Sequence, residues 1–131
     1  MAQVLTLARH ESSFVVVDLP RSMDAASLKA LDMATAIYLV VDSSMAALRD
    51  AKRLLKLFQS LGYGSEKLRL IVNKVSSSRG MDQKNLEATL GVRITHTVPA
   101  QFEEVQQCID LGQAIGQLHP HSPVAIALRQ A

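Results

Sequence analysis

The fold is decided by the stretch AIYLVVDSSMAALRDAKRLLKLFQSLGYGSEKLRLIVNK, residues 36–74. It opens with an apolar run at 36–41 that ends in Asp42, and it closes with a second run at 68–72 that ends in Asn73. Continuous apolar runs, unlike alternating ones, are typical of strands that are buried on both faces of a parallel sheet. Because the segment between the runs has helical spacing, the stretch predicts a strand–helix–strand unit.

The predicted helix covers residues 45–61 and has one apolar face. That face consists of Leu48, Ala51, Leu54, Leu55, Phe58 and Leu61. Such a stripe is typical of a helix that packs on a sheet. Ser43 or Ser44 can cap its start, and Gly62 stands where a C-terminal cap is expected. The opposite face carries Arg49, Lys52, Arg53 and Lys56. We expect this basic face to be solvated, since no Trp or Phe flanks it for membrane insertion.

The same alternation continues on both sides of this unit. Further apolar runs at 14–17 and 94–98 end at Asp18 and Pro99. Helical spacing recurs at 23–34, 81–90 and 101–115, and a last short helix follows Pro123. We predict a helix followed by four strand–helix repeats, which is an α/β fold with a parallel, Rossmann-like sheet and helices on both faces. Residues 1–131 are expected to form a single domain.

Composition excludes several classes of protein. The chain has 131 residues, of which 48% are hydrophobic, and a net charge of +2, so it is neither disordered nor basic enough to predict nucleic-acid binding. The single cysteine, Cys108, excludes an internal disulfide and is expected to pack in the core. No apolar run reaches about 18 residues, and the start is too short and polar for a secretory signal, so we expect a soluble, cytoplasmic protein with no membrane insertion.

Candidate site residues follow from the topology. Ligands of such sheets bind at the carboxyl ends of the strands. The residues expected there are Asp18, Pro20, Asp42, Ser43, Asn73, Lys74 and Pro99. The pair of an acid, Asp18, and an amide, Asn73, is the most informative. Both residue types are also common strand terminators and helix caps, so a structural role for either stays open at this point.

A family resemblance narrows these alternatives. The stretch FVVVDLPRSMD (14–24) resembles the Walker B and switch II segment of the MinD/ParA group of deviant P-loop ATPases, in which an apolar strand ends in Asp-x-Pro. LRLIVNK (68–74) is similar to the strand of that group whose terminal Asn reads adenine. Residues 95–130 resemble the closing Val/Ile-Pro loop and the tail. The similarity covers roughly residues 10–131 and implies a P-loop NTPase-like sheet.

Within that group, three segments are most similar to CpaE/TadZ, the ATPase-like pilus assembly and localisation proteins of Flp type IV pilus systems. They are DLPRSMD (18–24), LRDAKRLLKLFQSLGY (48–63) and HSPVAIALR (121–129). The resemblance therefore implies protein partners in a pilus assembly machine.

The resemblance also implies roles for four residues, with ATP and Mg²⁺ as cofactors. Asp18 would hold Mg²⁺ through water, which suits a hard cation that keeps several waters. Pro20 would shape the switch segment that senses the γ-phosphate. Asn73 would offer its amide, one donor and one acceptor, to the adenine edge. Pro99 would begin the loop that covers the base.

One family element is missing from these residues. The phosphate-binding loop, rich in Gly and carrying Lys and Ser/Thr, lies upstream of all these segments in the family. GYGSEK (62–67) follows a helix and precedes a strand, the reverse of the required order, so we expect a helix cap and a turn there. The implied fold lacks the P-loop strand and corresponds to the C-terminal portion of an ATPase-like domain. Hydrolysis by this chain alone is not expected, because the main donors to the phosphoryl group are missing.

Three functional hypotheses remain. The first is a CpaE/TadZ-like module that does not hydrolyse ATP and acts through protein–protein contacts. The second is the C-terminal part of a functional MinD/ParA-like ATPase whose P-loop lies upstream. The third is a flavodoxin-like or receiver-like binding module. Without a central strand the Phe14–Asp18 edge is open, so we expect either direct closure of the remaining strands or a homodimer that buries this edge.

Overall fold

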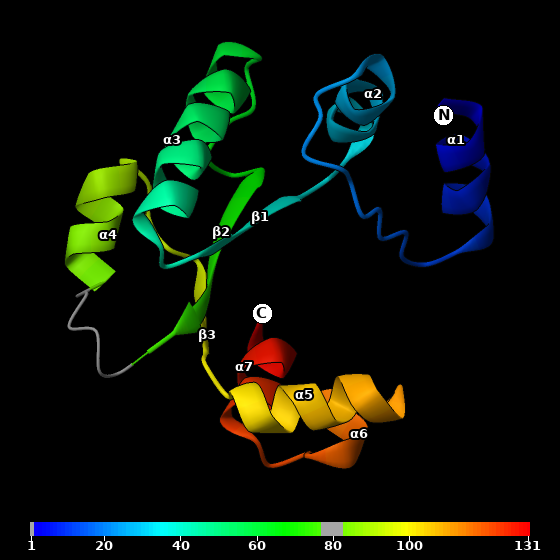
Figure 1. Cartoon of the computed structure of the whole chain (residues 1–131). Coiled ribbons are helices and arrows are strands. Elements are labelled where there is room, and N and C mark those ends of the chain that lie inside the picture. Colours follow the sequence, from blue (N-terminus) through cyan, green and yellow to red (C-terminus); the bar gives the residue numbers. More distant parts are fainter. Residues whose placement is uncertain (1, 77–82) are drawn as a thin grey trace. The chain divides into compact units, whose positions relative to one another are not determined.

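The computed structural model describes residues 2–76 and 83–131 (Figure 1). The chain divides into a first unit, Met1–Ile37, and a second unit, Tyr38–Ala131, and each is described by itself. The elements in chain order are α1 (Ala2–Glu11), α2 (Ala25–Met33), β1 (Ile37–Asp42), α3 (Met45–Ser60), β2 (Leu68–Val75), α4 (Gln83–Leu90), β3 (His96–Pro99), α5 (Phe102–Leu111), α6 (Ile115–Leu118) and α7 (Pro123–Gln130).

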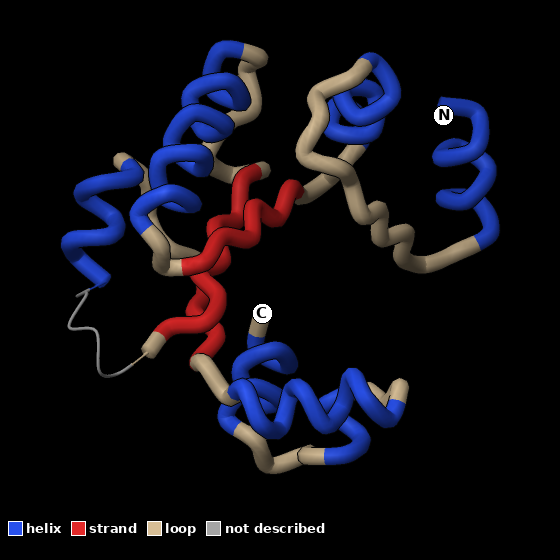
Figure 2. Tube along the Cα trace, in the orientation of Figure 1, coloured by secondary structure: helices blue, strands red, loops and turns tan. Residues whose placement is uncertain are grey.

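The sheet has three parallel strands in the order β1-β2-β3 (Figure 2). Between β2 and β3, Val72 lies opposite Thr97 and Val75 lies opposite Pro99. One strand thus advances by one residue more than the other, which is a β-bulge in β2. The predicted parallel α/β fold with helices on both faces is confirmed.

One face of the sheet is covered by α3 and α4. The buried cluster there joins Val41, Leu70 and Val72 of the strands to Leu48, Ala51 and Leu55 of α3 and to Leu86 and Leu90 of α4. Leu48 is 1% exposed and Val72 is 0% exposed. The apolar stripe predicted for the central helix is therefore the side that packs on the sheet.

Both ends of α3 are capped as the sequence predicts. The hydroxyl of Ser44 accepts the Ala47 N–H at 3.3 Å. At the other end Gly62 takes a left-handed conformation, φ 79°, and the Tyr63 N–H donates to the Phe58 carbonyl at 3.0 Å. These bonds close the last turn of the helix. The predicted helix cap and turn at residues 62–67 are confirmed.

The opposite face is covered by α5, α6 and α7. Its buried cluster is smaller and joins Ile71 and Val98 of the strands to Val124 and Ala127 of α7. The predicted helix at 101–115 is wrong in extent, because Gly112 at φ 62° ends α5 and a separate short helix, α6, follows. A helix cannot continue through a left-handed residue. The helix predicted at 81–90 is seen at Gln83–Leu90, and residues 81 and 82 lie outside the described residues.

The first unit contains α1, which the sequence analysis did not delimit, and α2, which it predicted. Asp24 caps α2, since its carboxylate accepts the Ser27 N–H at 2.7 Å. This hydrogen bond from the Ser27 backbone, followed by one from its side chain, lowers the pKa of Asp24 below its ordinary value. Leu5, Ala30 and Leu31 are buried.

The predicted strand at residues 14–17 is wrong. In the described structure these residues belong to no helix or strand, and Phe14 is 89% exposed and Val16 95% exposed. A strand exists through hydrogen bonds to a neighbour, and an apolar sequence supplies the preference without supplying that neighbour. The described sheet is therefore built from three strands rather than four.

Within the described part of the chain, no helix combines the length and the apolar character needed to cross a lipid bilayer.

Candidate functional site

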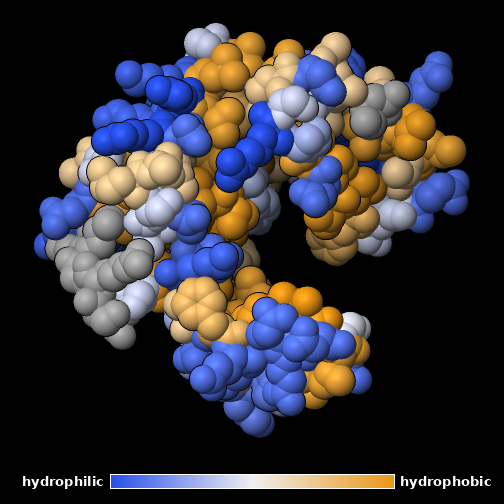
Figure 3. All heavy atoms as spheres, viewed as in Figure 1, coloured by the Kyte–Doolittle hydropathy of each residue, from blue (hydrophilic) through white to orange (hydrophobic). Residues whose placement is uncertain are grey.

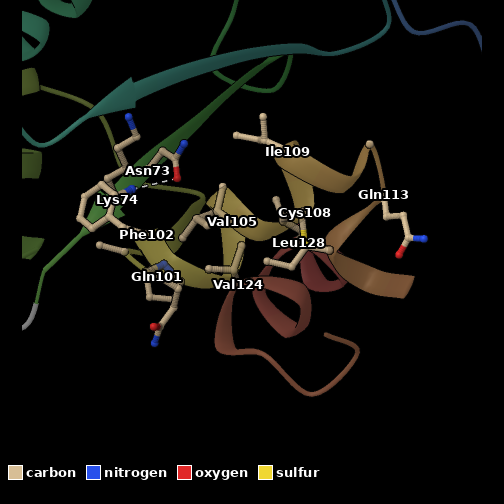
Figure 4. Close-up of a pocket in the computed structure, with 15 residues that line it drawn as sticks. Asn73, Lys74, Gln101, Phe102, Val105, Cys108, Ile109, Gln113, Val124 and Leu128 are labelled. Carbon is tan, nitrogen blue, oxygen red and sulfur yellow. Dashed lines mark hydrogen bonds between the residues drawn. The ribbon is translucent and has the colours of Figure 1, made fainter. Parts of the chain in front are cut away.

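A cavity of about 480 Å³ opens in the second unit, where β2 and β3 end and α5 begins (Figure 4). This volume lies within the range of ligand-binding sites, about 300–1,000 Å³. In the view of Figure 4, Asn73, Lys74 and Phe102 lie toward one end and Gln113 lies at the other, with apolar side chains between them. Figure 3 shows the outer face of α5 as hydrophilic, bordered by hydrophobic residues.

The apolar wall of the cavity comes from α5 and α7. Val105 and Cys108 of α5 and Val124 and Leu128 of α7 all line it. Cys108 is buried and is a free cysteine, as the sequence predicts for a packed thiol. Phe102, Val105 and Ile109 follow helical spacing, so one face of α5 points to the cavity. An aromatic or apolar ligand group is favoured by such a wall.

The polar end of the cavity is made by the bulge of β2. Lys74 has φ 57° and is, among the described residues other than glycine, the one with positive φ. This conformation costs a residue with a side chain about 1–2 kcal/mol. Backbone strain of this kind concentrates at binding and catalytic sites, which makes the Asn73–Lys74 pair a candidate functional feature.

The amide of Asn73 is oriented by its own neighbour. Its Oδ1 accepts the backbone N–H of Lys74 at 2.8 Å (Figure 4). Because a backbone N–H can only donate, this bond assigns the oxygen and the nitrogen of the amide. The Nδ2 group has no hydrogen-bond partner within the described residues, and Asn73 lines the cavity half-buried.

The loop at the mouth of the cavity is tied to β2. Pro99 ends β3, and the N–H of Ala100 donates to the carbonyl of Val75 at 3.0 Å. This bond continues the pairing of the strands by one residue beyond Pro99. Gln101 and Phe102, which follow, also line the cavity. The segment that leads into α5 is therefore hydrogen-bonded to the end of β2.

Three comparisons place this geometry among known proteins. No family model matches the chain. The uncharacterized ATP-binding protein MJ0547 of Methanocaldococcus jannaschii is 24% identical over 131 residues, which covers 99% of this chain and 48% of that protein.

Several solved structures are similar in fold. A ParA family ATPase from Chlorobium tepidum TLS has a TM-score of 0.90 at 20% identity, and the match covers 98% of this chain and 54% of that one. MinD of Aquifex aeolicus, solved in a complex with MinC, gives 0.81 at 20% identity over 97% and 54%. MinD of Pyrococcus horikoshii OT3 with Mg-ADP gives 0.76 at 16% identity over 96% and 51%.

The chain has the ParA/MinD fold. It spans about half the length of the relatives that it matches. The three parallel strands and their surrounding helices correspond to part of the Rossmann-like P-loop NTPase architecture of those ATPases. The flavodoxin-like or receiver-like hypothesis is thereby replaced by the ParA/MinD-like one at the level of fold.

In this ParA/MinD-like chain, three of the residues predicted at the strand ends line one cavity, namely Asn73, Lys74 and Pro99. Asn73 and Pro99 come from different strands and line the same cavity. Asp18 and Pro20 lie in the first unit, in an exposed stretch without helix or strand, and are described with that unit alone. Asp42, expected at the same end of the sheet, uses its carboxylate to accept the Ser44 N–H at 2.7 Å where α3 begins.

Lys74 was expected at the strand ends without a specific role, whereas Gln101 and Phe102, which also line the cavity, were not expected there. The apolar spacing of Phe102, Val105 and Ile109 on α5 was an available signal. No sequence signal marks a lysine that takes a positive φ. Among the described residues, no three His, Cys, Asp or Glu side chains gather in a way that would hold a metal ion.

Proposed function

We propose that the cavity of the second unit binds the adenine end of ATP or ADP and that residues 1–131 act as part of a nucleotide-responsive ParA/MinD-like domain. One observation carries the proposal. Asn73 and Pro99 line a single cavity at the carboxyl ends of parallel strands, which is where α/β sheets of this kind bind ligands.

The chemistry of the cavity fits a purine base. Apolar side chains of α5 and α7, such as Val105 and Leu128, suit the two faces of a flat ring. The Nδ2 group of Asn73 supplies a directed hydrogen-bond donor at the polar end. This donor is half-buried and has no partner within the described residues, so a ligand acceptor that reaches it would gain a directed hydrogen bond. The MinD of P. horikoshii, which shares this fold, was solved with Mg-ADP.

By the family resemblance, Asp18 of the first unit would be a ligand of Mg²⁺. Asp18 is exposed and offers one carboxylate. Mg²⁺ is commonly bound through one or two carboxylates, with phosphate oxygens and waters as the other ligands. The residue therefore fits a metal that arrives with ATP, and it does not form a metal site of its own. Pro20 would shape the segment that responds to the phosphates.

At a finer level, we propose that the chain acts as a CpaE/TadZ-like module in pilus assembly or localisation. The support is the resemblance of segments 18–24, 48–63 and 121–129 to those proteins. We include action through protein contacts rather than hydrolysis in this proposal, because residues 1–131 carry no Gly-rich loop with Lys and Ser/Thr between a strand and a helix. MinD of A. aeolicus, of the same fold, was solved in a complex with its partner MinC. A homodimer is a second form of contact that this proposal includes.

The alternative is the C-terminal part of a functional ATPase whose P-loop lies upstream. Steady-state release of phosphate from Mg·ATP separates the two ideas. Turnover above the level of the uncatalysed reaction by the 131-residue chain alone would contradict the module that does not hydrolyse ATP.

The nucleotide proposal is tested by thermal unfolding with Mg·ATP and Mg·ADP. A ligand that binds only the folded state stabilises it by about 2.7 kcal/mol at a hundredfold excess over its dissociation constant. We expect this stabilisation in the wild type and its loss in Asn73→Ala. We expect Asp18→Ala to weaken the effect of Mg·ATP in particular, because the carboxylate acts through the metal.

Asn85→Ala is the matched control. Asn85 is an exposed asparagine of α4, and α4 packs on the other face of the sheet. This variant should keep the full nucleotide response. No stabilisation of the wild type at millimolar nucleotide would overturn the proposed function.

A further inference from the structure

The outer faces of α3 and α5 carry charges of opposite sign. We propose that the basic face of α3 binds the acidic face of α5 in a second copy of this chain, so that copies associate head to tail. The acidic residues of that face, Glu103 and Asp110, do not line the cavity. The inference therefore goes beyond the proposed nucleotide function and holds or fails independently of it.

The basic face of α3 consists of four exposed cations that lie within about 100° of the helix circumference, at 3.6 residues per turn. They are Arg49, Lys52, Arg53 and Lys56. Residues four apart are neighbours on a helix surface, so Arg49 lies beside Arg53 and Lys52 beside Lys56. Like charges in these positions destabilise a helix. The stability of α3 itself therefore does not explain this stripe of charge.

Little within the described residues compensates these cations. Arg53 Nη1 lies 3.9 Å from Asp50 Oδ1, and both side chains are exposed. The side chains of Arg49, Lys52 and Lys56 make no ion pair or hydrogen bond with another described residue. Their charge is available to a partner molecule.

The acidic face of α5 has matching dimensions. Glu103 and Asp110 are seven residues apart, as are Arg49 and Lys56, and seven residues of helix span about 10 Å. Both acids are exposed, and Gln106 Nε2 donates to Asp110 Oδ1 at 2.8 Å. The last turn of α5 holds no basic residue, although the helix dipole disfavours a carboxylate such as Asp110 there. A cation from another molecule would offset this repulsion.

The two charged faces cannot meet within one molecule. The helix α3 covers one face of the sheet, and α5 lies on the opposite face. A contact between α3 of one copy and α5 of the next leaves each molecule one unused face, so the association is heterologous and can continue beyond a dimer. Exposed apolar side chains of the same helices, Leu57 of α3 and Leu111 of α5, would add contact area.

Sedimentation velocity of the 131-residue chain without nucleotide tests the association. At protein concentrations up to about 1 mM, the weight-average mass should rise above that of a dimer in about 0.01 M salt. Raising the salt to about 1 M shortens the screening length from about 30 Å to about 3 Å, and the association should weaken at least about tenfold. A monomer at both salt concentrations, or a dimer that does not grow, would overturn the inference.

Charge reversal identifies the two surfaces. The α3 variant carries Arg49→Glu, Lys52→Glu and Lys56→Glu, and the α5 variant carries Glu103→Lys and Asp110→Lys. Each variant then has two faces of like sign, so each alone should be monomeric in low salt. In an equimolar mixture, α3 of either variant meets α5 of the other with opposite sign, so association should return. A mixture that stays monomeric would contradict the pairing of these faces.

The combination of Arg9→Glu, Arg21→Glu and Lys29→Glu is the matched control for the α3 variant. These three cations are exposed in the first unit, and their reversal changes the net charge of the chain by the same amount. The control should associate as the wild type does. Its failure to associate would show that the net charge, and not the face of α3, governs the association, which would also overturn the inference.

Discussion

The two faces of the sheet differ in how completely they are filled. On one face, α3 and α4 close over the strands, and Leu48 and Val72 are almost inaccessible to solvent. On the other, α7 packs on Ile71 and Val98, and α5 stands over a cavity of about 480 Å³. The same strand, β2, serves both faces, and at its bulge Asn73 and Lys74 line the cavity.

The difference separates two tasks. Burial of apolar surface stabilises a fold by about 25 cal/mol per Å². The face under α3 and α4, the closed face, buries the larger apolar cluster, so we expect it to contribute more to the free energy of unfolding than the opposite face. Side chains around a cavity lack neighbours on one side and lose dispersion contacts. The face under α5 and α7, the open face, is therefore expected to contribute less to the free energy of unfolding, and it provides a volume that a ligand can occupy. Substitutions on the two faces should have opposite consequences for stability and binding.

The largest effect is expected for Leu48→Ala on the closed face. Leu48 is 1% exposed and lies in the α3–α4 cluster. Truncation of a buried leucine costs about 2–5 kcal/mol through lost transfer energy and the cavity left behind. Urea unfolding should show this loss, whereas ADP affinity under folding conditions should be unchanged. A loss below about 1 kcal/mol would contradict the tight packing of this face.

A smaller loss of stability is expected from enlarging a side chain, and one enlargement on each face distinguishes the two faces. Ala51→Leu enlarges a residue that is 1% exposed on the closed face, and overpacking of this kind costs about 1–3 kcal/mol. Cys108→Leu places the added atoms beside the cavity and should cost less than about 1 kcal/mol.

The loss of ADP affinity should follow the opposite order from the cost in stability. Cys108→Leu is expected to weaken ADP binding, because it occupies ligand volume, and Ala51→Leu is expected to leave the affinity unchanged. Chemical denaturation and titration calorimetry measure the two quantities on the same samples. Equal costs of unfolding for the two variants would remove the distinction between the faces.

The smallest effect concerns pH and Glu87 of α4. Its carboxylate accepts the Ile94 N–H at 2.8 Å and the Gln83 side-chain amide at 3.3 Å. These bonds, that of Ile94 first, lower the pKa of Glu87 below its ordinary value. A lowered folded-state pKa contributes stability above the pKa of the unfolded chain, and that stability is lost as the pH falls through the folded-state pKa.

Melting temperatures measured from neutral to acidic pH should therefore fall less steeply in Glu87→Gln than in the wild type. Asp24 of α2, with its own lowered pKa, should make a separate contribution of the same sign. Identical pH profiles of the wild type and Glu87→Gln would show that the Ile94 contact does not matter for the closed face.

Two stretches show how far the sequence predicts this fold. FVVVD (14–18) and IYLVVD (37–42) are both apolar runs that end in Asp, yet only the second forms a strand in the described structure. The second is followed by α3, which packs on it, and then by β2, which is its hydrogen-bonded neighbour in the sheet. Periodicity predicts the tendency to form a strand, whereas pairing is decided by which partner is at hand.

Two residues of the site were predictable from the sequence for a physical reason. Asn73 and Pro99 were expected together because the carboxyl ends of parallel strands meet at one edge. The cavity itself and the left-handed Lys74 were not expected. A bulge without glycine leaves no mark in the sequence, and the end of α5 at Gly112, which shapes the far side of the cavity, was taken for the interior of a longer helix.

We propose that the open face binds the adenine end of a nucleotide in the cavity at Asn73 and Pro99. The most direct measurement is an NMR titration of the labelled chain with Mg·ADP. Mg·ADP should shift the signals of the Asn73 side-chain amide and of the Val105 and Leu128 methyl groups and should leave the methyl groups of Leu48 and Leu55 unmoved. Shifts confined to α3 and α4, or none at millimolar Mg·ADP, would contradict this proposal.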